Sequence, residues 1–314
     1  MSSLDIIIVN YNSGDGLKRC LESIKRADKK HFELGKVIVV DNASSDRSAD
    51  FSIQMDELEI IRKEKNIGFA AACNMGASAG DSELVLFLNP DVELFADSLD
   101  VPVNFLLHEA PDEVGIVGIQ LVDLDGRVTR TSGRIPHPAN LLNRILLLDR
   151  ISPRIFKGYL MNDWDHGNSA YVGQVTGAFF LIARDLFERL GGFDERFFIY
   201  FEELDLSLRA ARAGYRSYYL AGVKAMHEGG VSSRSDVSAR NYYLSRSRIL
   251  FAFKHFNSFE AWVVTAAVLT IEPIVRFVGS LVRFSPAAAA STISTCRRVW
   301  RDLGEILSER SRNG

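Results

Sequence analysis

The chain of 314 residues lacks the cysteine patterns and the charge excess that mark several protein classes. Its three cysteines, Cys20, Cys73 and Cys296, lie far apart, and none belongs to a C-x-x-C pair. A zinc site and a disulfide framework are therefore disfavoured, and a reducing cytoplasmic compartment is the simplest expectation. The net charge of −3 gives no reason to expect general affinity for nucleic acids.

The sequence also lacks a long hydrophobic run. Its start shows neither a basic region nor a cleavage site before the first strand-like segment, so we expect no signal peptide. The longest apolar run, residues 261–271, is about half as long as a membrane span. We therefore expect no membrane-spanning helix.

What the chain does have is a regular alternation of strands and helices over its first 90 residues. Alternation of this kind predicts a mostly parallel sheet with right-handed crossovers. We predict an α/β fold in which a mostly parallel central sheet is flanked by helices. The strands are expected at residues 5–9, 36–40, 60–62 and 84–88.

The later residues predict further elements and a domain division. We expect strands at 114–117, 176–182 and 215–220, a hairpin around Asp125-Gly126, and a short helix over 141–148. Only helices are predicted after residue 240. The predicted catalytic domain covers residues 1–256, with a nucleotide-binding half to about 95 and an acceptor half from about 96, and a helical extension covers 257–314.

The strand at 84–88 organises this pattern because it ends at Asn89-Pro90-Asp91. Proline cannot donate to a strand ladder and restricts the residue before it, so Asp91 should lie at the carboxyl end of the strand. Open α/β sheets bind ligands at that edge, where a carboxylate suits a divalent cation that also touches phosphate. An ordinary Asn-Pro-Asp turn is the structural alternative.

The earlier strands also end in polar loops. Asn10-Tyr11-Asn12 follows the first strand, Asp41-Asn42 follows the second, and the segment from Asn66 to Asn74 runs into an alanine-rich helix. At one sheet edge, these loops would form a crevice in which an aspartate binds a base or ribose and Tyr11 stacks on the base. Each loop alone is typical of an ordinary βα turn, but together with Asp91 they favour a nucleotide site. The chain has no G-x-G-x-x-G motif and no P-loop, which disfavours those two classes.

A second constellation, Glu202-Glu203-Leu204-Asp205, opens a predicted helix. Adjacent carboxylates repel one another, which raises the pKa of one of them and suits a general base. The helical period places Glu203 at the edge of the buried face, whereas Glu202 should point elsewhere. Asp205 and Arg209 are expected to form a structural pair. An acid-rich helix start without a catalytic role is the alternative.

In this order, the motifs resemble those of the family 2 glycosyltransferases with the GT-A fold, especially bacterial rhamnosyltransferase-like enzymes of cell-wall and surface polysaccharide synthesis. The resemblance covers roughly residues 4–250. The matching motifs are Val9-Asn10-Tyr11-Asn12, Asp41-Asn42-Ala43-Ser44-Ser45-Asp46, Asn66-Ile67-Gly68-Phe69, Asn74-Met75-Gly76, Leu88-Asn89-Pro90-Asp91, Thr176-Gly177-Ala178, Gly191-Gly192-Phe193-Asp194, Phe201-Glu202-Glu203-Leu204-Asp205 and His227.

The resemblance implies a role for each site residue. Asp91 and His227 would hold Mg²⁺ or Mn²⁺, and Glu203, with Glu202 beside it, would be the catalytic base. Asn89 stands where the family has the first acid of its D-x-D motif, and Glu203 stands where it has an aspartate. The residues implied to contact the nucleotide-sugar are Asn10, Tyr11, Asp41, Asn42, Asn66, Gly68, Asn74 and Asn89.

The implied activity is inverting, metal-dependent transfer of a sugar to a glycan or a polyprenyl-diphosphate-linked acceptor, with L-rhamnose from dTDP-rhamnose as the leading expectation. The alternatives are a UDP-sugar-dependent galactofuranosyl or hexosyl transferase, a sugar nucleotidyltransferase, and a non-catalytic nucleotide-sugar-binding protein. A nucleotidyltransferase needs a basic glycine-rich loop after the first strand, and this chain has Asn10-Tyr11-Asn12-Ser13 there.

The C-terminal helices carry an amphipathic segment at residues 274–284. One face is apolar, with Arg276 and Arg283 opposite it, and a basic cluster lies nearby. This pattern suits a helix at a lipid interface and predicts peripheral attachment to the inner face of the cell membrane. Packing against the catalytic domain or a second subunit is the alternative. The apolar face is Ile274, Phe277, Val278, Leu281 and Val282, and the cluster is Arg297, Arg298 and Arg301.

Overall fold

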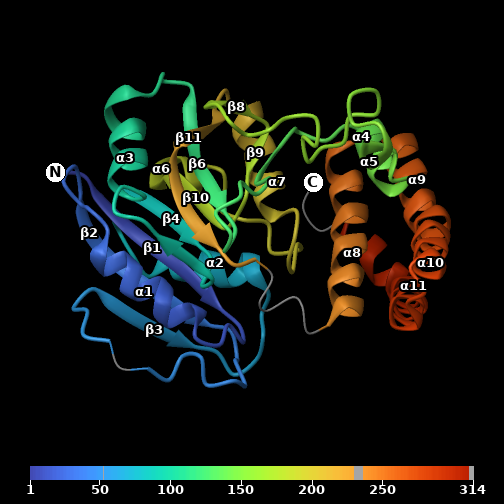
Figure 1. Cartoon of the computed structure of the whole chain (residues 1–314), viewed down its shortest axis with the longest axis horizontal. Helices are drawn as coiled ribbons and strands as arrows, with labels where there is room; N and C mark the ends of the chain where they lie inside the picture. The colour runs from blue at the N-terminus through green and yellow to red at the C-terminus, as the bar shows by residue number, and fades with distance from the viewer. Residues whose placement is uncertain (52, 230–235, 311–314) are drawn as a thin grey trace. The chain divides into compact units, whose positions relative to one another are not determined.

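The computed structural model of the chain describes residues 1–51, 53–229 and 236–310 (Figure 1). It divides into two compact units. The predicted boundary at residue 257 falls inside the second unit, which also takes in an earlier segment of the chain. The α/β unit comprises Met1–Gly133, Asp165–Glu195 and Glu202–Ser232, and the helical unit comprises Arg134–Trp164, Arg196–Phe201 and Ser233–Gly314.

The α/β unit is built on one nine-stranded sheet in the order β3-β2-β1-β4-β10-β6-β11-β5, with β8 beside β11. The strands β1 to β4 pair in parallel, as predicted. In contrast, β10 runs antiparallel to both of its neighbours, so the whole sheet is mixed. The strands are β1 (Ser3–Asn10), β2 (Glu33–Asp41), β3 (Leu58–Arg62), β4 (Leu84–Leu88), β5 (Val92–Leu94), β6 (Val114–Val122), β8 (Ala170–Val172), β10 (Phe179–Ala183) and β11 (Arg216–His227); β7 (Ser132–Gly133) and β9 (Gln174–Val175) form a separate pair.

Helices cover both faces of this sheet. Alternate residues of each buried strand point to opposite faces, so Leu86 and Phe87 of β4 join two different apolar clusters. The first cluster includes side chains of α1, and the second includes side chains of α2 and α7. The strand β4 is therefore buried on both faces, as its five apolar residues predict. The helices are α1 (Gly16–Arg26), α2 (Phe69–Ser78), α3 (Asp100–Asn104), η1 (Phe105–Glu109), α6 (Arg184–Arg189) and α7 (Glu202–Arg212).

Three predicted strands and turns differ in the structure. The turn at Gly126 forms with a φ of +76°, but only an isolated bridge joins Val122 to Val128, so the second hairpin strand is absent from this described segment. Residues 176–178 form a loop, and β10 begins only at Phe179. The strand β11 runs on to His227 because β5 supplies a pairing partner, so His227 ends that strand instead of following it.

The helical unit consists of α4 (Pro138–Ile145), α5 (Leu148–Ile151), α8 (Val237–His255), α9 (Ser258–Ala266), η2 (Ala267–Ile271), α10 (Glu272–Val282) and α11 (Pro286–Glu309). The elements α9, η2 and α10 continue one another as a single helical stretch of 25 residues. By length and composition alone, this stretch is long and apolar enough to cross a membrane, and 33% of its most apolar window is buried inside the protein. The helix continues its apolar pattern well beyond the run at 261–271, so the apolar segment is longer than that run indicates.

Candidate active site

The loops after β1 and β2 are joined by Asn10, the last residue of β1. The strand register pairs Asn10 with Asp41, the last residue of β2. The side-chain amide of Asn10 donates to a carboxylate oxygen of Asp41 at 2.9 Å and to the hydroxyl of Ser48 at 2.9 Å. Because Asn10 is 0% exposed, its contacts hold Asp41 in place and shape the edge of the crevice.

A second set of contacts fastens the tips of the same two loops. The backbone N–H of Asn12 donates to Ser44 at 3.0 Å, and the side chain of Asn12 accepts from the N–H of Ser45 at 2.8 Å. Between these anchors, Tyr11 is 39% exposed. Its ring is therefore partly accessible, which is compatible with the predicted stacking on a base.

The segment before α2 is ordered by two further asparagines. The amide of Asn42 donates to Asn66 at 3.0 Å, and the N–H groups of Ile67 and Gly68 donate to Asn42 and Asn66 at 2.9 Å. Gly68 has a φ of +91°, a conformation that favours glycine. These residues bring the loop after β3 beside the loop after β2.

Asn74 has a different set of partners. Its amide donates to the carbonyl of Phe193 at 2.8 Å, and its oxygen accepts from the N–H of Phe193 at 2.9 Å. The same turn is held by Arg209, which donates to the carbonyl of Gly192 at 2.7 Å and to Asp205 at 2.8 Å. The predicted Asp205–Arg209 pair is therefore confirmed, and Asn74 ties α2 to this turn.

Asp91 and His227 face each other at the carboxyl ends of β4 and β11. A carboxylate oxygen of Asp91 lies 3.2 Å from Nε2 of His227, in side chains that are 8% and 17% exposed. The two atoms are close, but Nε2 has no hydrogen bond in the described structure. Adjacent ligands of an octahedral ion, each about 2.1 Å from it, lie about 3 Å apart. The pair therefore fits a shared Mg²⁺ or Mn²⁺.

The protein supplies only part of such a coordination shell. In the described residues, no group of three or more His, Cys, Asp or Glu side chains could hold a metal ion. A cation with two protein ligands takes its other ligands from water and phosphate oxygens, which is typical of Mg²⁺. Asn89 lies two residues before Asp91, and its N–H donates to the carbonyl of Ala178 at 3.1 Å.

Arg19 of α1 is a positioning residue that the sequence analysis missed. Its guanidinium binds Glu93, two residues after Asp91, and Glu228, next to His227, the latter at 2.8 Å. Arg19 therefore ties together the two segments that carry the predicted metal ligands. The only signal in the sequence was a basic residue on the polar side of an amphipathic helix, which is too common to single out.

The acid pair opens α7 after two backbone residues with unusual conformations. Tyr200 and Phe201 have φ values of +69° and +75°, which are costly for large side chains. Glu202 is only 4% exposed and Glu203 is partly buried. We expected Glu202 to point away from the buried face of the helix, but it is the more deeply buried of the two. The helix α7 begins at Glu202 and packs its first turn into the α/β unit.

The two carboxyl groups differ in their proton affinity. Burial raises the pKa of Glu203, while N–H groups of its own residue, Gly177 and Leu204 act in the opposite direction. Burial and then the negative charge of Glu203 raise the pKa of Glu202 well above its usual value. The pKa of Glu203 is raised as predicted, but the main cause is burial. Of the two, Glu203 is better suited to carry the negative charge, and Glu202 to keep its proton.

One short loop joins the acid pair to the end of β4. The backbone N–H of Gly177 lowers the pKa of Glu203, which places it near that carboxyl group, and the next residue, Ala178, accepts the hydrogen bond from Asn89. Glu203 and the Asn89-Pro90-Asp91 turn are therefore neighbours through residues 177–178, within one compact unit. A candidate base, a candidate cation site and polar loops suited to a nucleotide, all at one sheet edge, can together support transfer from an activated, phosphate-linked donor.

Comparison with known proteins gives a consistent picture. The model of the family described as glycosyl transferase family 2 matches residues 5–191. The chain is 26% identical over 273 residues to the N-acetylglucosaminyl-diphospho-decaprenol L-rhamnosyltransferase of Mycobacterium tuberculosis, which covers 79% of this chain and 83% of that one. It is 27% identical over 268 residues to the rhamnosyltransferase WbbL of Escherichia coli, covering 78% and 94%. It is also 28% identical over 262 residues to the low-salt glycan biosynthesis hexosyltransferase Agl10 of Haloferax volcanii, covering 82% and 78%.

Solved structures of similar fold support the same conclusion. The mannosyltransferase PcManGT from Pyrobaculum calidifontis, in complex with GDP-Man and Mn²⁺, has a TM-score of 0.51 at 17% identity and covers 98% of this chain and 85% of its own. GalNAc-T7 with UDP, GalNAc and Mn²⁺ has a TM-score of 0.53 at 14% identity, covering 91% and 58%. The predicted GT-A fold is confirmed, with a mixed sheet and a C-terminal helical region.

Proposed function

The chain belongs to glycosyltransferase family 2, and on that premise we propose that it transfers a sugar from a nucleotide-sugar to an acceptor hydroxyl in one inverting displacement. Glu203 takes the proton from the acceptor hydroxyl, whose oxygen then bonds to the anomeric carbon as the bond to the nucleoside diphosphate breaks. The observation that supports this proposal is the loop at residues 177–178, because the backbone N–H of Gly177 lowers the pKa of Glu203 and Ala178 accepts a hydrogen bond from Asn89 in the turn that bears Asp91.

The other residues would bind and orient the donor. Asp41, held by Asn10, would accept hydrogen bonds from the base, and Tyr11 would stack on it. Asn42, Asn66 and Gly68 would shape the loop around the ribose and diphosphate. Asn74, which lies further along on α2, would also contribute to donor binding. We assign these contacts from the geometry of the loops and from the family resemblance. Asn89 is the last residue proposed to bind the donor.

Asp91 and His227 would hold the cation that accompanies the diphosphate. Bound Mg²⁺ or Mn²⁺ would neutralise the negative charge of the leaving group. The 3.2 Å separation of the two ligand atoms supports this assignment. The two similar solved structures, which contain Mn²⁺, agree with it.

For the donor we propose dTDP-L-rhamnose, and for the acceptor a glycan on a polyprenyl diphosphate, in cell-wall or surface polysaccharide synthesis. Two relatives named as rhamnosyltransferases support the sugar, and the diphospho-decaprenol in one of those names supports the acceptor class. Because such an acceptor is anchored in a membrane, the enzyme would act in the cytoplasm at the inner face of the cell membrane. The hexosyltransferase among the relatives supports a hexose as the second candidate sugar, and we propose UDP as its carrier.

The direct test is transfer to a short-chain polyprenyl-diphosphate acceptor with Mn²⁺ and a panel of donors, followed by mass spectrometry. We expect dTDP-rhamnose to give an acceptor that is heavier by one deoxyhexosyl unit, with release of dTDP. Transfer from a UDP-hexose alone would contradict the donor assignment. Donor binding without turnover on any acceptor would indicate a binding protein, and formation of a nucleotide-sugar from a sugar phosphate would indicate a nucleotidyltransferase.

A further inference from the structure

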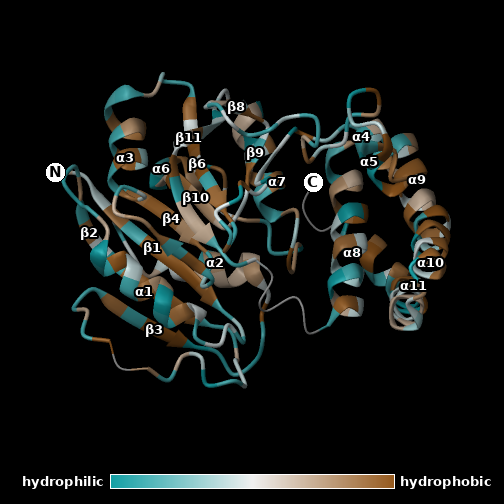
Figure 2. Ribbon diagram, in the orientation of Figure 1, coloured by the Kyte–Doolittle hydropathy of each residue, from teal (hydrophilic) through white to brown (hydrophobic). Residues whose placement is uncertain are grey.

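The continuous helical stretch α9-η2-α10 exposes a row of apolar side chains. Within α9 and within α10 these residues recur every three to four positions, so in each helix they lie along one side. None of the residues that this described stretch exposes carries a charge. Brown, hydrophobic segments are visible along α9 and α10 in Figure 2. We call Phe259, Trp262, Ile274, Val278, Leu281 and Val282 the apolar stripe; they are 47–78% exposed.

The charged side chains of this stretch lie on its opposite side. Glu272 is buried and forms an ion pair with Arg248 of α8 and another with Arg276, one turn along α10. A helix on the surface of a soluble protein normally buries its apolar side and exposes its charges. The reversed arrangement leaves a large exposed apolar surface, and such surfaces mark interaction sites.

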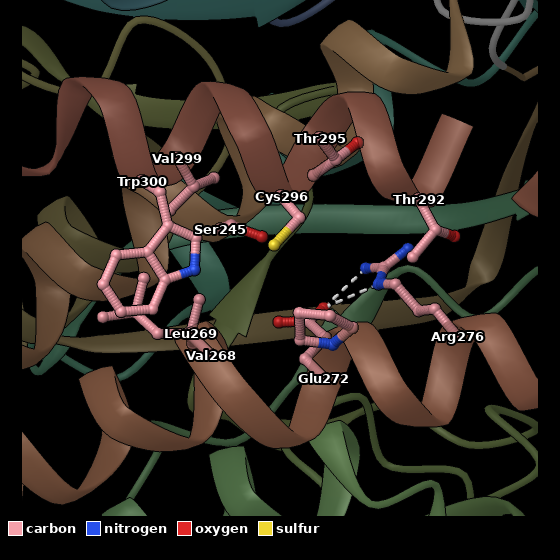
Figure 3. Close-up of a pocket in the computed structure, with 11 residues that line it drawn as sticks. Ser245, Val268, Leu269, Glu272, Arg276, Thr292, Thr295, Cys296, Val299 and Trp300 are labelled. Atoms are coloured by element: carbon pink, nitrogen blue, oxygen red, sulfur yellow. Dashed lines mark hydrogen bonds and ion pairs between the residues drawn. The ribbon is translucent and has the colours of Figure 1, made fainter. Parts of the chain in front are cut away.

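The cavity beneath this surface is too small for a substrate. It lies among Glu272, Arg276 and Cys296, and the ion pair between Arg276 and Glu272 is drawn at its edge (Figure 3). Its volume is about 20 Å³, which is room for a single water molecule. A ligand of this region must therefore bind on the outside.

Outside, an apolar depression of about 340 Å³ lies between α10 and α11 and includes Ile274 and Phe277. A second depression of about 500 Å³ shares Ile293 and Arg297 with it and adds further guanidinium groups. No acidic side chain lines either depression in the described residues. The apolar surface therefore continues directly into a cationic one, whose other arginines are Arg298 and Arg301.

Two of the cations at this surface have no acidic partner among the residues that the structure describes. Arg283, exposed at the end of α10, and Arg297, exposed on α11, form no ion pair in the part of the chain that the structure describes. Arg301, in contrast, binds Asp302 at 2.6 Å. Unpaired guanidinium groups beside exposed apolar side chains match a phospholipid, whose phosphate lies next to its acyl chains.

We propose that this surface binds the headgroup region of a bilayer that contains anionic phospholipid, with the apolar stripe among the upper acyl chains and Arg283 and Arg297 at the phosphates. This surface would serve the proposed function, on which the proposal rests, because an enzyme that acts on a lipid-linked acceptor must reach it at a membrane. The binding itself requires neither donor nor acceptor.

Two other occupants fit the observations less well. A helix that crossed the membrane would carry the Glu272–Arg248 pair into hydrocarbon, where charged groups are costly. A second copy of the chain, packed stripe to stripe about a twofold axis, would bring each set of arginines close to its own copy, and like charges repel.

The test is co-sedimentation of the full chain with vesicles of phosphatidylcholine, with and without phosphatidylglycerol. We expect binding to the anionic vesicles. The triple variant Ile274→Ser/Val278→Ser/Leu281→Ser should weaken it at least about tenfold, as should Arg283→Glu/Arg297→Glu. The matched controls are Leu124→Ser/Val128→Ser and Arg26→Glu/Arg127→Glu, exposed residues of the α/β unit that should leave binding unchanged.

All changed side chains in these variants are exposed, so thermal unfolding should be close to that of the wild type. Absence of binding to anionic vesicles by the wild type would overturn the proposal. So would equal binding by the triple variant, or resistance of the bound protein to alkaline carbonate, which would indicate a spanning helix. A dimer in ultracentrifugation that the stripe variant dissociates, with vesicle binding unchanged, would assign the stripe to a second copy instead. Loss of sugar transfer alone, with binding intact, would count only against the proposed function.

Discussion

Glu202 and Glu203 adjoin in sequence, yet their carboxyl groups differ in burial and in proton affinity. Burial and the charge of Glu203 raise the pKa of Glu202 well above its usual value. A carboxyl group whose pKa is raised in the folded state binds its proton more tightly there than in the unfolded chain. It therefore stabilises the fold at low pH, and this contribution is lost as the pH rises through the folded pKa.

The first prediction concerns Glu202. The substitution Glu202→Gln keeps the shape and removes the ionisable proton, so it should raise the urea midpoint of unfolding at pH 8. The gain should shrink as the pH falls toward about 4.3, the ordinary pKa of a glutamate. Urea unfolding at both pH values checks it. Destabilisation by Glu202→Gln at pH 8 would show that the buried carboxylate has favourable partners.

The second prediction concerns the two predicted metal ligands, Asp91 and His227. EDTA should abolish transfer and Mn²⁺ should restore it. Asp91→Ala should lower turnover roughly 100-fold or more, the scale for losing one stabilising group at a developing charge, and should weaken binding of the donor. His227→Ala should act in the same direction.

The measurements are turnover and donor affinity by calorimetry, with and without Mn²⁺. The matched control is Asp125→Ala, an acid whose side chain is 66% exposed on the hairpin turn, which should behave as the wild type. Full activity in EDTA would refute the metal assignment. It would point to basic side chains as the groups that neutralise the diphosphate.

Among the elements, the edge of the sheet opposite the active site is held by Asp5, Ser82 and Arg184. Arg184, the first residue of α6, donates to Asp5 of β1 at 2.8 Å, and Asp5 also accepts from the N–H and hydroxyl of Ser82. Asp5 is 0% exposed. Burial would raise its pKa, but hydrogen bonds from Lys36 and Ser82 and the charge of Arg184 lower it overall.

The third prediction is therefore that Asp5→Asn destabilises the fold by about 3–5 kcal/mol near neutral pH, because it leaves the guanidinium of Arg184 without its buried partner. The lowered pKa means that Asp5 contributes stability above its unfolded pKa of about 3.9 and loses it as the pH falls through the folded pKa. The difference in stability between wild type and Asp5→Asn, measured by urea unfolding, should narrow in acid. Equal midpoints at pH 7 would contradict this account.

The sequence predicted the elements of this unit well where local pattern decides them. The strand β4 is a pure apolar run that stops at Asn89-Pro90, and α7 begins at the acids and ends before Gly214, as expected. The loop at 176–178 was missed because its apolar neighbours continue the strand pattern, while the actual start of β10 is set by a hydrogen bond from Asn89. A hydrogen bond between residues so far apart in the chain cannot be predicted from the local sequence pattern.

The candidate site was predictable as a set of residues but not as a set of contacts. The strand-end position of Asp91 follows from its proline, whereas the influence of the Gly177 N–H on the pKa of Glu203 joins residues far apart in the chain. The deep burial of Glu202 was missed for a related reason. Helical periodicity describes one helix, and the burial of a first turn depends on what other elements pack against it.

At the scale of the whole molecule, chemistry and lipid binding are assigned to different units. The residues proposed for catalysis lie in the α/β unit and the apolar stripe lies in the helical unit. The fourth prediction is therefore a separation of effects. With a water-soluble acceptor, Ile274→Ser/Val278→Ser/Leu281→Ser should keep wild-type turnover while losing vesicle binding, whereas Glu203→Gln should keep vesicle binding while losing turnover.

The separation is measured by assaying each variant for both properties. With an acceptor embedded in anionic vesicles, the stripe variant should lose turnover as well, because it no longer reaches the substrate. A stripe variant that is equally impaired on the soluble acceptor would show that the helical unit contributes to the chemistry itself.

The central claim is that Glu203 is the base of a glycosyl transfer, and one paired measurement tests it most directly. Donor affinity by calorimetry and turnover against pH are compared for wild type, Glu203→Gln and Glu202→Gln. Glu203→Gln should bind the donor as the wild type does but turn over roughly 100-fold or more slowly, the usual scale for losing a general base. Glu202→Gln should cost less. Wild-type turnover should fall as the pH drops through the raised pKa of Glu203, because the base must be ionised to accept a proton. Normal turnover by Glu203→Gln would contradict the account, and an inactive Glu202→Gln beside it would move the base to the neighbouring residue.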